Sequence, residues 1–393
     1  MNIALSADVT FNGRILNANP YAILIDVSTN KIVKIVAPDA VPKGYKHIHL
    51  KNKVLAPGFI DLQVNGCGGV NFNQDISINA LTTMKNTLEN HATTGFLPTL
   101  ITCDFNDVIT ALEVIKQWFE QYGDGFGVLG IHLEGPFISK EKHGIHPIEH
   151  IIIPTLKNLE LIAQYRKYFP IKMTIAPEVF TFDQIKYLID AGIVLSIGHS
   201  NADYKTVKQA IDLGATTATH IFNAMSGLSA RNPGVIGAFL SMPNTFSGII
   251  VDLLHVDPVN VKLLSQVKAD TTYLVSDAVA PTGTSMDKFT FANTELYVKD
   301  GKCVDKNGTL GGAILTLDYA VYNCVTKCNI MPGHALKMAS TTPSNVMNFN
   351  HLGKIAPNAY ANFIMFDRIY NDDNELTIPS TLFEVVKYDK FLN

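Results

Sequence analysis

The chain has 393 residues, of which 47% are hydrophobic and 17% charged, and its formal net charge is −4. This composition is typical of an ordered globular protein that is long enough for two structural units. It gives no basic surface for nucleic acid and no apolar stretch that would span a membrane. The first residues, Met1–Leu5, lack the basic and apolar segments of a signal peptide, so we expect a cytoplasmic protein.

Both ends of the chain have the sequence pattern of β-strands. Residues 1–55 contain alternating and β-branched segments such as Lys31–Val36, with turn residues between them. The segment Gly353–Asp367 has the same character. We therefore predict one small β-sandwich domain built from residues 1–55 and 353–393, and a central domain of residues 56–352.

In the central domain, apolar strand patterns alternate with helical patterns. Eight strands are predicted at Gly58–Val64, Gly95–Thr102, Val128–Glu134, Lys172–Pro177, Val194–His199, Ala215–His220, Gly248–Asp252 and Tyr273–Asp277. Helices are predicted between most of them, at Leu81–His91, Val108–Phe119, Asn158–Tyr168, Phe182–Ala191 and Thr206–Leu213. This order predicts an α/β fold, a (β/α)8 barrel of the TIM type, whose chemistry takes place at the carboxyl ends of the strands.

Four chemically reactive side chains fall at four of these strand ends: Glu134, His199, His220 and Asp277. Taken singly, each has an ordinary explanation, because a histidine is often structural, an Asp can cap a turn and a Glu can pair with Lys or Arg. A carboxylate directly after the apolar run Gly127–Ile131 is nevertheless unusual without a cation beside it. Together, at one end of one barrel, the four residues favour a hydrolytic metal site.

The residue types indicate the chemistry of that site. Glu134, His199 and His220 supply one oxygen and two nitrogen ligands and leave a coordination position open. This set suits one divalent metal ion per subunit, and it favours Zn²⁺, although Fe²⁺ also accepts it. Asp277 would be the general base that takes a proton from the attacking water and returns it to the leaving nitrogen. The predicted reaction is metal-assisted hydrolysis of an amide.

Four motifs carry a resemblance to a known family. The segment Ala56–Asp61 resembles the first barrel strand of the amidohydrolase superfamily. The segments His132–Pro136, Gly198–Ser200 and Thr219–Met225, in this order, resemble the N-acetylglucosamine-6-phosphate deacetylase family. The resemblance implies a metal held by Glu134, His199 and His220, a catalytic Asp277, and hydrolysis of the N-acetyl group of an amino-sugar phosphate.

The resemblance also implies which residues contact the phosphosugar substrate. They are Ile145, His146, Asn223, Ala224, Arg231, His255, Leu310, Gly311 and Gly312. It places His146 against the sugar and its N-acetyl group, and Arg231 against the phosphate, for which a guanidinium has paired donors. It implies that His255 reaches the substrate phosphate of a neighbouring subunit, and hence a homodimer.

The sequence departs from the family pattern in two informative places. Many superfamily members carry His-x-His after the Asp of the first strand, where this chain has Gln63 and Asn65. Amides are poor Zn²⁺ ligands, so these two residues are interpreted as neighbours of the metal or as a vestigial second site. Leu253 stands where the Asp-Gly-x-His pattern has glycine, which is expected to alter the loop that carries His255.

Other functions remain open at this level. The chain could be an N-acetylgalactosamine-6-phosphate deacetylase or a cyclic-amide hydrolase, or a barrel that has lost catalysis. Cyclic-amide hydrolases commonly keep His-x-His and a metal-bridging Lys, and a scaffold would have lost ligands. The presence of all four strand-end residues therefore favours the deacetylase.

Overall fold

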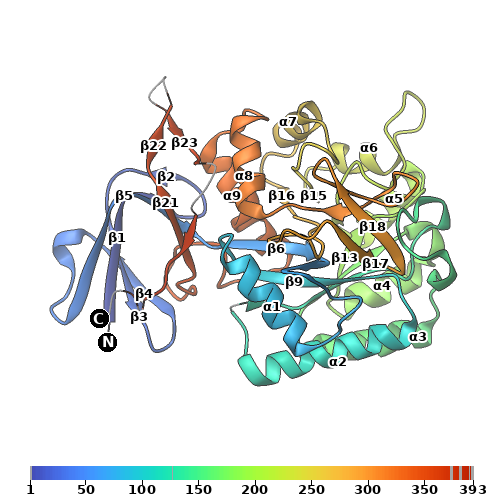
Figure 1. Cartoon of the computed structure of the whole chain (residues 1–393), viewed down its shortest axis with the longest axis horizontal. Coiled ribbons are helices and arrows are strands. Elements are labelled where there is room, and N and C mark those ends of the chain that lie inside the picture. The colour runs from blue at the N-terminus through green and yellow to red at the C-terminus, as the bar shows by residue number, and fades with distance from the viewer. Residues whose placement is uncertain (1, 126, 372–374, 380–382, 389, 391–393) are drawn as a thin grey trace.

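The computed structural model describes residues 2–125, 127–371, 375–379, 383–388 and 390. Strands from both ends of the chain join in one seven-stranded mixed sheet, in the order β24-β21-β5-β1-β3-β4, with β2 paired to β1. The strands are β1 (Asn2–Phe11), β2 (Leu16–Asn17), β3 (Ala22–Asp26), β4 (Lys31–Val36), β5 (Tyr45–Pro57), β21 (Phe363–Asp367) and β24 (Glu384–Val385). Figure 1 shows these blue and red strands side by side, beside the barrel.

The predicted pairing of the two ends is confirmed, and it runs through one continuous sheet. Strand β21 is antiparallel to β5, with Phe363 opposite Pro57 and Asp367 opposite Lys53. Only Gly58 separates the end of β5 from the first barrel strand, so the sheet leads directly into the barrel. The division into residues 1–55 plus 353–393 and residues 56–352 stays a prediction.

The central residues form a barrel of parallel strands, as predicted. The barrel strands are β6 (Phe59–Val64), β9 (Thr93–Ile101), β11 (Ile131–Glu134), β12 (Ile171–Ile175), β13 (Val194–Ile197), β14 (Thr217–Ala218), β15 (Phe246–Ile249) and β16 (Thr272–Leu274). The two-residue strand β10 (Gly127–Val128) adds to β9. Their order in the sheet follows the chain, with β6 beside β9. The last strands are shorter than predicted, because the chain turns before His199, His220 and Asp277.

The barrel closes where its first strand meets the residues that follow its last strand. Val64 pairs with Ala278 in parallel register. The backbone N–H of Asp277 donates to the carbonyl of Gln63 at 3.0 Å, and that of Asn65 donates to the carbonyl of Ala278 at 2.8 Å. The buried carboxylate of Asp61 accepts the N–H of Ser276 across the same seam and the N–H of Gln63 from its own strand.

Amphipathic helices surround the barrel. They are α1 (Ile78–Glu89), α2 (Phe105–Tyr122), α3 (Leu156–Ala163), α4 (Phe182–Asp190), α5 (Tyr204–Leu213), α6 (Gly234–Ser241), α7 (Pro258–Val267), α8 (Leu317–Thr326), α9 (Pro332–Ala339) and α10 (Thr341–Val346). Helix α2 buries Val108, Ala111, Leu112, Ile115 and Trp118, the spacing of one helix face. Several helices start at a side-chain cap, for example at Thr181 of α4 and Asp203 of α5. Among the helices described here, none has the length and apolarity needed to cross a membrane.

An antiparallel four-stranded sheet, which the sequence reasoning did not predict, interrupts the barrel pattern after β16. It consists of β17 (Lys288–Phe291), β18 (Thr294–Lys299), β19 (Lys302–Val304) and β20 (Leu310–Ala313). Its last strand is attached to the barrel, because the N–H of Ala313 donates to the carbonyl of Asp277 at 2.9 Å. Figure 1 shows these orange strands across the barrel. We call residues 288–313 the flap.

Phe366 of β21 tests how strongly the terminal sheet is coupled to the barrel. Its ring contacts Phe383, which also contacts Phe59 at the start of the barrel, with centroids 4.7 and 5.4 Å apart. Phe366→Ala should lower the free energy of unfolding by about 3–5 kcal/mol, because it leaves a cavity in a closed core. Denaturant unfolding measures this. The exposed aromatic Tyr370→Ala is the control and should stay within about 0.5 kcal/mol of the parent; an equal loss in both variants would contradict the coupling.

Candidate metal and hydrolytic site

Three of the four predicted strand-end side chains meet at a single point. The Nε2 atom of His220 lies 2.9 Å from Oε1 of Glu134, and Nε2 of His199 lies 3.2 Å from the same oxygen. The two Nε2 atoms are 3.1 Å apart. The three side chains are almost fully buried and form a near-equilateral triangle of donor atoms.

The triangle has the dimensions and the chemistry of a metal site. Donor atoms around a tetrahedral Zn²⁺ at ordinary bond lengths lie about 3.4 Å from one another. His199 Nδ1 donates to the carbonyl of Lys142 at 2.8 Å, so its Nε2 carries the lone pair that faces Glu134. A lone pair and a carboxylate held this close need a shared cation or proton. The donor set therefore fits one divalent metal ion.

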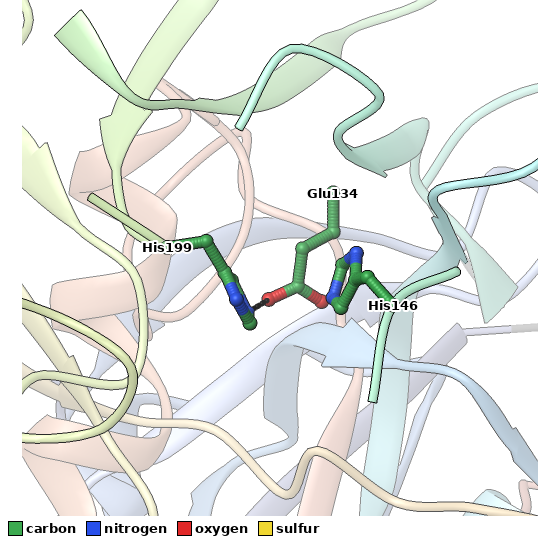
Figure 2. Close-up of side chains that lie close together, drawn as sticks. All are labelled: Glu134, His146 and His199. Carbon is green, nitrogen blue, oxygen red and sulfur yellow. Dashed lines mark ion pairs between the residues drawn. The ribbon is translucent and has the colours of Figure 1, made fainter. Parts of the chain in front are cut away.

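His146 offers a second way to complete a metal site. Ligand atoms of Glu134, His146 and His199 also lie within 4.8 Å of one another. Figure 2 shows the carboxylate of Glu134 between the two rings. However, Nδ1 of His146 accepts the backbone N–H of Thr102 and lies 2.8 Å from the Thr102 hydroxyl. The ring proton is then on Nε2, which makes His146 a hydrogen-bond donor rather than a ligand.

Two amides hold the fourth predicted residue, Asp277, beside the triangle. Asn65 Nδ2 donates to Asp277 Oδ1 at 2.7 Å, and Gln63 Nε2 donates to the same oxygen at 3.0 Å. Gln63 Nε2 also lies 3.2 Å from both oxygens of Glu134. The amides therefore present N–H donors where a second cation would need ligand atoms, in agreement with a site for one metal.

Burial and charge shift the acid–base behaviour of these groups in opposite directions. Burial raises the pKa of Glu134, but the imidazoles of His199 and His220 beside it outweigh burial and hold that pKa well below its usual range. Burial and the nearby charge of Glu134 raise the pKa of Asp277. The environment thus favours the ionised form of Glu134 and makes protonation of Asp277 easier. Two carboxyl groups with pKa values shifted in opposite directions are typical of acid–base sites.

The backbone at the site is strained. His199, His220 and Asp277 have φ angles of 47°, 29° and 52°, and the neighbouring Ala224 has 48°. Residues with a Cβ rarely occupy this left-handed region, which costs each of them about 1–3 kcal/mol. These angles turn the chain sharply at the strand ends and point the side chains toward the common centre.

The site opens into a pocket of about 360 Å³. Of the predicted substrate residues, those that line it are Ile145, His146, Asn223, Ala224, His255, Leu310 and Gly312, and Asn65 lines it as well. Gly312 has φ +74°, and a Cβ there would come within 2.9 Å of the carbonyl oxygen of Asp277. A glycine is therefore needed where the flap crosses the catalytic strand end.

Two predicted substrate residues do not line the pocket, and a third, His255, lies in the pocket wall of its own chain. Arg231 is exposed in the loop before α6, and Gly311, in the last strand of the flap, lies against Leu296 and Ile145. His255 lies in the wall of its own chain's pocket, where Asp252 Oδ2 holds its Nδ1 at 2.6 Å. The expectation that His255 reaches the substrate of a neighbouring subunit stays a prediction. Leu253 adopts φ +67°, the conformation that a glycine would favour, so the loop is strained rather than rearranged.

Several residues at the site were missed by sequence reasoning. Lys142, Ile101 and Phe291 line the pocket, and Thr102 orients His146. Thr102 follows the end of β9, so the strand-end rule could have found it. Lys142 and Phe291 lie in a loop and in the flap, and no sequence pattern places either near the barrel mouth.

His132 lies below the site and does not contact the triangle. Its ring nitrogens lie 3.2 Å from the hydroxyl of Thr99 and 2.7 Å from that of Thr174. Lys172 Nζ is 3.2 Å from His132 Nε2, and burial lowers the pKa of Lys172 to about 7. A buried polar layer thus supports Glu134 from the barrel interior, as expected for a structural His132.

Comparison with known proteins adds independent information. The model of the amidohydrolase family matches residues 54–390. An N-acetylglucosamine-6-phosphate deacetylase of Haemophilus influenzae is 36% identical over 89% of this chain and 91% of its own length. An N-acetylgalactosamine-6-phosphate deacetylase of Shewanella is also 36% identical, over 82% of this chain and 81% of its own.

A solved structure agrees over nearly the whole chain. The crystal structure of an N-acetylglucosamine-6-phosphate deacetylase from Pasteurella multocida has a TM-score of 0.88 and 37% sequence identity. It covers 96% of this chain, and this chain covers 97% of it. The similarity therefore includes the barrel and the terminal sheet together.

Two matched variants distinguish the alternative ligand sets. His220→Asn should lower the metal content of the purified protein at least tenfold, because it removes a corner of the donor triangle. His146→Asn should keep one metal per chain while it loses activity, because its Nδ1 already accepts from Thr102. Elemental analysis after dialysis measures both. Loss of metal in His146→Asn, with metal kept in His220→Asn, would show that Glu134, His146 and His199 are the ligands instead.

Proposed function

The chain belongs to the amidohydrolase family, and from this membership we propose that it hydrolyses the N-acetyl group of N-acetyl-D-glucosamine 6-phosphate to D-glucosamine 6-phosphate and acetate. The observation that carries the proposal is the donor triangle beside Asp277 in a pocket of sugar-phosphate size. The similarity to deacetylases at 36–37% identity over most of the chain supports the substrate. The reaction serves amino-sugar breakdown or recycling, and we place it in the cytoplasm because a charged sugar phosphate does not cross a bilayer.

The enzyme needs a metal, and we propose one Zn²⁺ per subunit, held by Glu134, His199 and His220. Fe²⁺ would accept the same ligands. When bound, the metal supplies Lewis acidity that activates the water and polarises the carbonyl of the amide. Gln63 and Asn65 direct amide N–H groups at the carboxylates, which disfavours the two-metal arrangement of cyclic-amide hydrolases.

Two side chains of the pocket perform the proton chemistry. Asp277, ionised at first, takes a proton from the attacking water at its carboxylate and passes it to the leaving amide nitrogen. Asn65 and Gln63 fix one oxygen of that carboxylate, so the other is free for the proton. His146, with its proton on Nε2, donates to the carbonyl oxygen as negative charge develops there.

The remaining pocket residues would bind the sugar and its phosphate. Asn223, Ala224 and His255 line one side, and Lys142 is the one Lys or Arg among the described lining residues. A dianionic phosphate is best held by a guanidinium. The exposed Arg231 lies outside its own pocket, so it is available to a neighbouring subunit.

We propose a homodimer that uses this face of the molecule. Helix α7 exposes Val259, Leu263 and Val267 at every fourth position, with 64%, 52% and 59% of each residue exposed. Leu254, beside His255, is 41% exposed and extends the apolar surface to the pocket. A helix face of this kind is typical of a surface covered by another chain. The loop of Arg231 projects before α6 on the neighbouring part of the barrel (Figure 1).

Release of acetate from N-acetyl-D-glucosamine 6-phosphate tests the proposed reaction. Protein loaded with Zn²⁺ should release acetate and chelator-treated protein should not. Absence of acetate from the loaded protein would refute the proposal.

Asp277→Asn should lower kcat by about 10²–10⁴-fold and keep the metal. Because Asp277 must be ionised to accept the proton, activity should fall as the pH drops through the pKa of this carboxylate. The exposed Asp190→Asn on α4 is the control and should change neither kcat nor the pH profile.

Arg231→Ala tests the contribution of the second subunit. It should raise KM for the phosphorylated substrate at least tenfold and leave the weak turnover of unphosphorylated N-acetylglucosamine unchanged, since only the phosphate contact is lost. Leu263→Glu should give monomers by light scattering and the same rise in KM. The similarly exposed Val33→Glu in the terminal sheet should give neither effect. An unchanged KM in Arg231→Ala would show that Arg231 does not bind the substrate phosphate.

A further inference from the structure

The wall of the pocket next to Glu134 is apolar and comes from β9. In parallel register, Ile101 of β9 is paired with Glu134 of β11, and Thr99 is paired with His132 two residues earlier. Thr99 and His132 contact each other inside the barrel at 3.2 Å. Side chains alternate along a strand, so Ile101 points to the same interior side as Thr99, directly beside Glu134. Ile101 lines the pocket and is 3% exposed.

The flap completes this wall. Phe291, at the end of β17, lines the pocket and belongs to the same apolar cluster as Ile101. Ile145, from the loop that carries His146, packs against that cluster. Most of the other lining residues are polar, among them Lys142, Asn223 and His255. The pocket therefore has an apolar wall beside the donor triangle and a mostly polar remainder.

Two asparagines hold the apolar wall in place. Asn73 makes a pair of hydrogen bonds to the backbone of Ile101, accepting its N–H at 3.0 Å and donating to its carbonyl at 3.1 Å. Asn71 donates to the carbonyl of Thr290, next to Phe291, at 3.1 Å, and accepts the N–H of Ala280 at 2.8 Å. Neither Ile101 nor Phe291 can move back without breaking these bonds. A rigid apolar wall discriminates by size, because it cannot yield to a larger group.

We propose that Ile101 and Phe291 form the acyl wall of the enzyme, which packs against the methyl group of the acetyl and limits hydrolysis to short acyl chains. The proposal rests on the proposed function. The amide carbon has three substituents: its oxygen faces His146, and its nitrogen faces Asp277 and leads to the sugar on the polar side. The third substituent, the acyl methyl, is left with the apolar surface beside Glu134. A methyl group gains from apolar contact and offers nothing to a polar wall.

The test is a substrate series that differs only in the acyl group: N-acetyl, N-propionyl and N-butyryl glucosamine 6-phosphate. All three release glucosamine 6-phosphate, so one assay of that product serves the series. In a closed apolar pocket one extra methylene changes kcat/KM by about 10–200-fold. The parent protein should therefore prefer acetyl to propionyl by at least tenfold.

Shortening the wall should shift this preference. Ile101→Val should raise the propionyl-to-acetyl ratio of kcat/KM about tenfold, and Ile101→Ala should extend the gain to butyryl. Phe291→Leu should raise the ratio in the same direction. Ile250, which lines the pocket from the end of β15 across the barrel, is the matched control. Ile250→Val should leave the ratio at its parent value.

The outcomes separate this proposal from the proposed function. If the parent releases acetate but the ratio is unchanged in Ile101→Val and Phe291→Leu, the acyl wall is refuted and the deacetylase stands. An equal gain in Ile250→Val also refutes it, because the effect is then general loosening. If Ile101→Ala fails to fold, Ile101→Val, which removes only one methyl group, still tests the acyl wall. If the parent hydrolyses none of the three, both proposals fall.

Discussion

The closure of the barrel is the constraint on which the site depends. The seam between β6 and the residues after β16 is held by Val64 opposite Ala278 and by the backbone hydrogen bond from Asp277 to Gln63. The same seam brings residues more than 200 positions apart into contact, so that Asn65 and Gln63 hold the carboxylate of Asp277. Without closure, Asp277, the proposed general base, would have neither its position nor its hydrogen-bond donors.

From the seam, the site divides into parts with separate physical tasks. Glu134 and the two histidines gather negative charge and lone pairs at one point, which suits a cation. The amides of Gln63 and Asn65 present N–H groups rather than ligand atoms, which disfavours a second metal site. The flap, tied to the Asp277 strand end through Ala313, supplies apolar surface that the barrel strands alone do not provide. A single fold thus combines a charged centre, a polar wall and an apolar wall within one small pocket.

The strands and the four central residues could be predicted from the sequence, because buried parallel strands are continuous apolar runs and their ends are known functional positions. Ile101 and the asparagines behind the wall could not, because their roles depend on strand register and on a loop that returns to the barrel. The flap was missed although its alternating residues are typical of hairpins. The position of His255 in the pocket wall depends on the turn formed by Asp252 and Leu253, and the sequence pattern does not predict that turn.

The left-handed backbone at His199, His220 and Asp277 has a consequence for how this protein can be improved. Glycine would relax each of these positions, but it would also remove a proposed metal ligand or the proposed base. Stability gained at these positions would therefore be lost from activity. A metal that binds the folded chain alone compensates part of this strain by mass action. The enzyme is therefore expected to be most robust when loaded, and resistance to heat should be sought in its helices and terminal sheet rather than at the barrel mouth.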